Sequence, residues 1–147
     1  MPRINPWGLP KPVLRCETRT LVDADTGFEV CLTLKQIDPI QIANAASRTQ
    51  EYDATYGGDS GIPLVLPATD GSGPEARMLP NAFFSQVAIL QEMEVPEPGD
   101  DPADLLWWAG IATRLPSVFG QISEWMAALM THSSAASKNG QRTPPAS

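Results

Sequence analysis

The residues that most readily suggest chemistry are a serine within Gly58-Asp59-Ser60-Gly61 and the single histidine, His132. This four-residue motif surrounds the nucleophile of chymotrypsin-like proteases, in which a histidine base and its orienting aspartate both precede the serine. Here no histidine precedes Ser60, and the 57 residues before the motif are too few for the first barrel of such an enzyme. We therefore interpret the motif as a tight loop, because glycine supplies positive φ and short polar side chains bond their own backbone.

A second group of reactive side chains is a run of carboxylates around a proline-containing linker: Glu92, Glu94, Glu97, Asp100, Asp101 and Asp104. Paired carboxylates are able to bind a divalent metal or to transfer a proton. The same residues are also typical of a solvated loop and of helix capping, and we favour this interpretation. Since no Ser-Lys or Cys-His pair and no phosphate-binding loop is recognisable, the sequence predicts no metal, no cofactor and no enzymatic activity.

The cysteines, Cys16 and Cys31, are predicted to remain unpaired. If the turn between them is centred near Asp25, Cys31 faces residues 19–21 and Cys16 faces residues 34–36. A disulfide requires Cα atoms within about 7 Å, which this register does not provide. Without a histidine nearby, these thiols also fall short of a zinc site.

Composition limits the classes of partner. The chain has 147 residues, a net charge of −7 and a pI near 4.5, so it fits one acidic domain. An acidic surface is repelled by phosphate backbones and by anionic lipids, which disfavours nucleic acid and membrane partners. No segment reaches the length of a membrane span, and the proline-containing start lacks the apolar stretch of a secretory signal. We therefore expect a cytoplasmic protein.

The pattern of apolar and turn residues predicts an α+β fold, in which a small antiparallel sheet of one or two β-hairpins packs with about four helices. The prolines in residues 1–14 bar helix and most strand pairing, so this segment should be an extended arm. We favour docking of the arm on its own domain over docking on a partner. Residues 15–130 form the single domain, with a helical C-terminal half. Residues 131–147 lack apolar periodicity and should form a disordered polar tail.

Turn and capping residues predict the boundaries of these elements. Alternation over residues 16–34 predicts the first hairpin, and residues 62–79 suggest a second. Asp38, followed by proline and with Gln41 three positions later, predicts a capped first helix. The next N-caps are predicted at Asn81 and Asp101, and Pro116 should stop or kink the third helix before the fourth begins.

The C-terminal helices carry more large apolar side chains than a thin core stripe requires. Neighbouring residues on a helix point about 100° apart, so two adjacent tryptophans are both buried only if two surfaces cover them. Tryptophan is enriched at interface hot spots, and methionine tolerates imprecise packing. We predict that these helices present an adhesive, partner-binding face. A large hydrophobic core explains the same residues equally well: Trp107, Trp108, Trp125, Met126 and Met130.

The order of elements resembles that of a known family. The hairpin Leu21-Val22-Asp23-Ala24-Asp25-Thr26-Gly27-Phe28-Glu29-Val30, then Leu32-Thr33-Leu34, a helix and an all-helical final half together resemble the tail assembly chaperones of long-tailed bacteriophages and prophages. The resemblance is one of layout and covers roughly residues 16–130. It implies a cytoplasmic, non-virion protein that coats the tape measure protein and helps recruit tail tube subunits, often made in a short form and a frameshifted longer form.

Other functions remain open. A minor virion protein or head–tail joining protein would use the proline-rich arm to clasp a neighbour. A small hydrolase using Ser60 or the acidic linker is the least favoured alternative. Self-association into a homo-oligomer is compatible with each of the binding functions.

Overall fold

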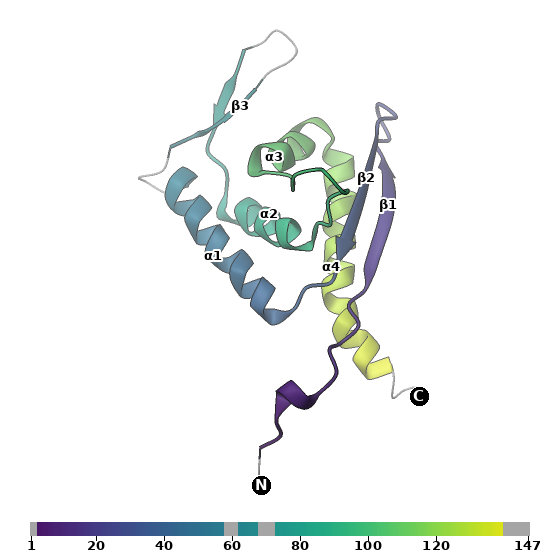
Figure 1. Ribbon diagram of the computed structural model, residues 1–147. Coiled ribbons are helices and arrows are strands. Elements are labelled where there is room, and N and C mark those ends of the chain that lie inside the picture. The colour runs from purple at the N-terminus through teal and green to yellow at the C-terminus, as the bar shows by residue number, and fades with distance from the viewer. Residues whose placement is uncertain (1–2, 58–61, 68–72, 140–147) are drawn as a thin grey trace.

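The computed structural model describes residues 3–57, 62–67 and 73–139, with side chains as far as Met130. Within them, four helices and two antiparallel two-stranded sheets confirm the predicted α+β fold (Figure 1). In chain order the elements are η1 (a 3-10 turn, Pro6–Gly8), β1 (Cys16–Val22), β2 (Glu29–Lys35), α1 (Pro39–Tyr56), β3 (Leu64–Leu66), β4 (Glu75–Arg77), α2 (Asn81–Met93), α3 (Leu105–Arg114) and α4 (Pro116–Asn139).

The first hairpin has the predicted register. Its turn is closed by Asp23, whose carboxylate accepts from the Thr26 amide at 2.8 Å, and by Gly27 with φ 79°. Cys16 lies opposite Lys35 and Cys31 lies opposite Thr20, so the two thiols are far apart in the ladder and both are free. The second hairpin, β3 with β4, forms a separate sheet rather than extending the first.

Helix starts agree with the sequence in one case and differ in two. At α1 the Asp38 carboxylate accepts from the Gln41 amide at 2.8 Å, and the Gln41 side chain returns a bond to the Asp38 amide, which confirms the capping box. At α2 the extended Pro80 is the N-cap, and Asn81 is already helical. At α3 the cap is Asp104 rather than Asp101.

The late start of α3 has a tertiary cause. The amide of Ala103 donates to the Glu94 side chain at 2.9 Å, which holds the preceding residues in the linker. Asp104 then caps the helix by accepting from the Trp107 amide at 2.9 Å. At its other end α3 stops at Arg114, and Pro116 is the first residue of α4, where a missing amide hydrogen costs nothing.

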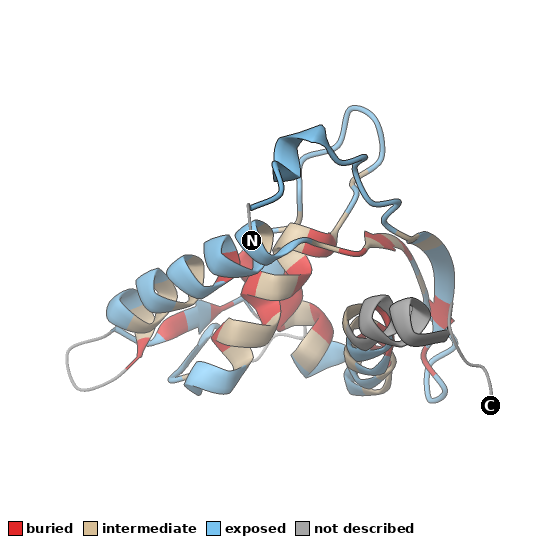
Figure 2. Ribbon diagram, turned by 90° about the horizontal axis from the view of Figure 1, so that it is seen from below, coloured by how far each residue is buried: buried red, intermediate tan, exposed pale blue. Residues whose placement is uncertain are grey.

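The core lies between α2 and the elements around it. α1 packs on α2, whereas the first hairpin contacts α2 and α4. The inward face of α2 is fully buried, and Figure 2 shows buried residues gathered in the middle of the molecule. The largest buried side chains come from β2 and from the last three helices: Leu34, Phe84, Leu90, Met93, Trp108, Ile122, Trp125 and Leu129.

Polar contacts fasten the first hairpin to α4. The indole N–H of Trp125 donates to Glu17 Oε1 at 2.8 Å, and the Arg19 guanidinium lies 4.9 Å from the centre of the same indole. Farther along, the buried Gln36 donates to the Leu129 carbonyl at 3.1 Å. The inner face of β1 therefore meets α4 through charged side chains as well as through the buried Leu21.

Hydrogen bonds at this contact also change the acidity of two carboxyls. The Trp125 N–H lowers the pKa of Glu17 below its ordinary value of 4.5; burial opposes this, and the neighbouring arginines add to the lowering. At the turn end of the hairpin, hydroxyl donors from Thr26 and Ser117 lower the pKa of Asp23 below 3.8. Both carboxylates are therefore held in their charged form.

At the C-terminal end of the described chain, α4 extends to Asn139. The remainder of the predicted tail, 140–147, lies outside the described residues. At the other end, Trp7 is 90% exposed, so the arm does not dock on its own domain as we had favoured. Within the described residues, no helix has the length and apolar character to span a membrane.

Candidate interaction surfaces

The five predicted partner-binding residues do not share one exposed face. Trp125, only 1% exposed, and the fully buried Trp108 belong to the core, and Met126 and Met130 are partly buried against it. Trp107 alone among the tryptophans of these helices is open to solvent, at 39%. Its ring meets Trp108 edge to face with centroids 4.9 Å apart. The prediction that these five residues form one adhesive face is therefore wrong. The exposed indole of Trp107, which packs on the buried Trp108, is what remains of it.

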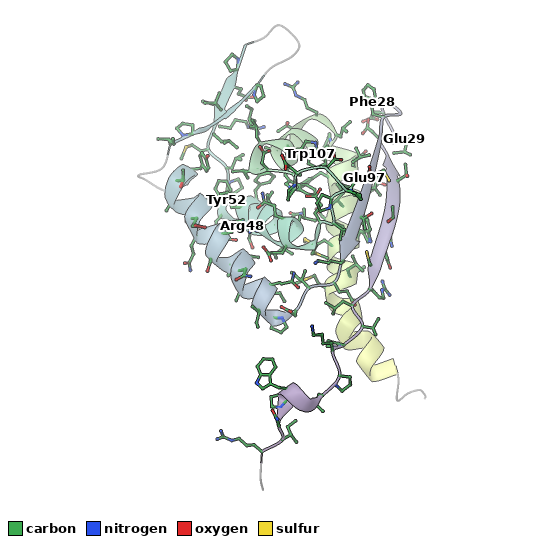
Figure 3. All side chains as sticks on the ribbon, viewed as in Figure 1. Phe28, Glu29, Arg48, Tyr52, Glu97 and Trp107 are labelled. Carbon is green, nitrogen blue, oxygen red and sulfur yellow. The ribbon has the colours of Figure 1, made fainter. Side chains whose placement is uncertain are left out.

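Trp107 stands at the edge of a cavity of about 630 Å³, here named the acidic groove. The groove lies between β2, the linker after α2 and the start of α3, and Figure 3 shows Trp107 and Glu97 on this side of the domain. Its apolar part includes Leu32, Val95, Pro96, Pro102 and Trp107. Its charged part consists of carboxylates: Glu94, Glu97, Asp100, Asp101 and Asp104.

Backbone contacts fix the shape of the acidic groove. The Val95 amide donates to the Thr33 carbonyl at 2.9 Å, and a β-bridge joins Glu94 to Leu34, so the linker starts as a short extension of the sheet. Gly99, with φ 90°, then reverses the chain. These contacts bring the carboxylates of the linker and Trp107 into the lining of one groove.

Several of the acidic residues have structural tasks, as the capping interpretation expected. Glu92 pairs with Arg48 at 3.0 Å, Glu94 accepts from Ala103, and Asp104 caps α3. No group of three potential metal ligands occurs in the described part of the chain. Within that part, the carboxylates of the acidic groove form no salt bridge with lysine or arginine. The groove therefore presents uncompensated negative charge, which attracts cations.

A second opening, here named the apolar cavity, has a volume of about 480 Å³. It lies between α1, β3 and α3, and its lining includes the exposed side chains of Ile62, Val65 and Leu106. On the α1 side the Tyr52 hydroxyl donates to Gln91 at 2.9 Å, and the Tyr52 ring rests 5.9 Å from Phe84. Asp104 borders both openings, so the acidic groove and the apolar cavity adjoin.

Sequence reasoning missed the apolar cavity because its parts come from segments without a shared motif. Alternation in Leu64-Val65-Leu66 was the available signal, since it turns Val65 outward while its neighbours are buried. The Gly58–Gly61 motif lies outside the described residues, and so does the side chain of His132.

The fold and its surfaces define an α+β protein with two adjoining openings, one acidic and one apolar. No protein-family model matches the chain, and comparison with curated proteins and with solved structures found no match.

Proposed function

We propose that this chain is a non-catalytic binding protein, acting in the host cytoplasm as a phage tail assembly chaperone that binds the tape measure protein and aids tail tube assembly. The apolar cavity carries the proposal. Exposed apolar side chains that surround a cavity are typical of a protein-binding site. A chaperone requires such a surface in order to cover an apolar segment of its client until assembly.

The geometry of the apolar cavity suits one face of a client segment. Leu106 projects from α3 and Val65 from β3, with Tyr52 and Tyr56 beyond them. Apolar anchors that recur on one face of a helix or strand dock into openings of this kind. The net charge of −7 supports the same function, because it helps to keep a complex with an aggregation-prone client in solution.

The test is co-expression of the chain with the tape measure protein from the same locus, followed by affinity capture. Leu106→Glu should abolish capture, because it places a carboxylate in the apolar cavity while its parent side chain is already 38% exposed. Ile40→Glu is the matched control, since Ile40 is exposed on α1 and lines neither opening. Both variants should keep the circular dichroism of the parent. Undiminished capture by Leu106→Glu would contradict the proposal.

A second measurement addresses the family. An immunoblot of the native locus, using an antibody to residues 1–20, should show a longer band sharing that N-terminus beside the band near 15.8 kDa. A single band would remove frameshifting as an argument for the chaperone.

The exposed arm favours one alternative, a minor virion or head–tail joining protein. Trp7 and Val13 are open to solvent on a segment able to clasp a neighbour. Mass spectrometry of purified particles distinguishes the two functions, because a chaperone is lost before maturation. Recovery of the chain in stoichiometric amount from particles would establish the alternative.

A further inference from the structure

The proline-rich arm exposes the indole of Trp7 on a short 3-10 turn, η1. In η1, Pro6 is the first residue, and the Asn5 side chain accepts from the Trp7 amide at 3.2 Å. Trp7 nevertheless remains 90% exposed. The neighbouring apolar side chains of the arm are exposed as well: Ile4, Leu9 and Val13. An exposed apolar segment of this kind marks an interaction site.

The point where the arm leaves the domain is fixed. The Arg15 amide donates to Gln36 Oε1 at 2.7 Å, and the Gln36 amide donates to the Arg15 carbonyl at 2.7 Å. From this anchor the arm runs away from the domain, as Figure 1 shows. Pro10 and Pro12 stiffen the path by favouring the extended polyproline conformation. Trp7 would reach its own acidic groove only if the chain doubled back at this anchor.

The charges of the arm and the acidic groove are complementary. The arm carries Arg3 and Lys11, and no aspartate or glutamate occurs before Glu17. The groove carries five carboxylates, and in the described part of the chain no lysine or arginine lines it. Opposite charges on two facing surfaces steer their encounter and fix their register.

The apolar parts also match. Proline-rich segments in the polyproline conformation dock on grooves that contain aromatic side chains. The acidic groove offers Trp107 for this purpose, with Val95 and Pro96 beside it. A polyproline segment rises about 3.1 Å per residue, so residues 9–14 carry the η1 turn roughly 19 Å away from the anchor at Arg15.

We propose that the arm of one copy binds in the acidic groove of a second copy, with Trp7 against Trp107 and Lys11 among the carboxylates of Glu97 and Asp100. The contact is between two different surfaces, so it closes into a dimer when it is reciprocal and continues along a chain when it is not. This self-association is separate from client binding at the apolar cavity.

The test is sedimentation of the full chain over a range of concentrations. The parent should associate, and raising ionic strength from about 0.05 M to about 0.5 M should weaken the association because exposed charges are screened. An arm variant, Trp7→Ala with Lys11→Glu, and a groove variant, Glu97→Lys with Asp100→Lys, should each be monomeric. The exposed control Glu51→Lys on α1 should associate like the parent.

Mixing the variants gives the decisive result. The groove variant keeps an intact arm, and the arm variant keeps an intact groove, so an equimolar mixture should recover a heterodimer. All of the substituted side chains are exposed, and circular dichroism should confirm that each variant is folded. Monomeric parent protein at every concentration would overturn the proposal, and so would association that survives in the arm variant. A monomer that still captures the client would leave the proposed function intact.

Discussion

Replacing Trp125 with phenylalanine tests whether a charge-assisted hydrogen bond fastens the first hairpin to α4. The indole is 1% exposed, and its N–H lies 2.8 Å from Glu17 Oε1. Phenylalanine keeps a buried ring but removes the donor. Glu17 then retains the neighbouring arginines as partners, yet it loses the contact that joins β1 to α4.

The expected loss of stability follows from two contributions. A hydrogen bond to a charged group contributes about 1.5–3 kcal/mol, and the lower end applies because the Glu17 side chain is 28% exposed and water replaces part of the bond. The smaller ring adds roughly 1 kcal/mol for the space it leaves. With a urea dependence of about 1–3 kcal/mol per molar, a loss of about 2–3 kcal/mol lowers the unfolding midpoint by roughly 1 M or more.

The assay is urea unfolding at pH 7, followed by far-ultraviolet circular dichroism, for the parent, Trp125→Phe, Glu17→Gln and the double variant. The double-mutant cycle should give a coupling of about 1 kcal/mol or more, because both substitutions act on one bond. Trp107→Phe is the matched control, and its free energy of unfolding should stay within about 0.5 kcal/mol of the parent's, because the residue is partly exposed and phenylalanine keeps a ring against Trp108. A Trp125→Phe midpoint equal to that of the parent, or a coupling near zero, would refute the reasoning.

Two further perturbations test the same contact between the hairpin and α4. The pKa values of Glu17 and Asp23 are lower in the folded chain than in the unfolded chain, so the unfolded chain binds more protons as the solution becomes acidic. The resulting stabilisation is complete above pH 4.5 for Glu17 and above pH 3.8 for Asp23, and it should be lost as pH falls through the lower folded pKa values. Thermal unfolding between pH 7 and pH 2 measures this loss, and an Asp23→Asn variant with the same acid profile as the parent would contradict it. Gln36→Leu leaves the Arg15 amide without its side-chain acceptor and removes the donor that links β2 to the Leu129 carbonyl, so a loss of about 1–3 kcal/mol is expected in urea unfolding. Full stability would show that these bonds contribute nothing.

The sequence predicts the fold best where the signals are local. The Asp38 capping box and the Asp23–Gly27 turn each involve residues within one turn of chain, and both occur as predicted. The start of α3 was predicted at Asp101 because Pro102 follows it at the first helical position, whereas Asp104 is an equally suitable cap residue. The bond from the Ala103 amide to Glu94 holds the intervening residues in the linker, and no capping pattern encodes that bond.

The candidate surfaces were less predictable for the same reason. Trp107 and Trp108 point about 100° apart on the helix, so periodicity alone does not tell whether Trp107 is covered as well as Trp108. The answer depends on how α3 sits against α4 and β3. The acidic groove likewise requires the Val95 amide to find the Thr33 carbonyl, a pairing between segments far apart in the sequence. The carboxylates were visible in the sequence, but the indole beside them was not assigned to the same surface.

Substitutions at the contact between the first hairpin and α4 affect stability, whereas substitutions on the open surfaces affect binding. Gln36 belongs to the folded framework and also anchors the arm through Arg15, so its substitution should alter stability and arm direction together. A loss of self-association in a Gln36 variant would therefore say little about the acidic groove. Trp7 and Glu97 are exposed and contribute nothing to the core, since neither packs against it. Because of this separation, variants of Trp7 and Glu97 are best suited to measure binding, and variants of Trp125 are best suited to measure the stability of the fold.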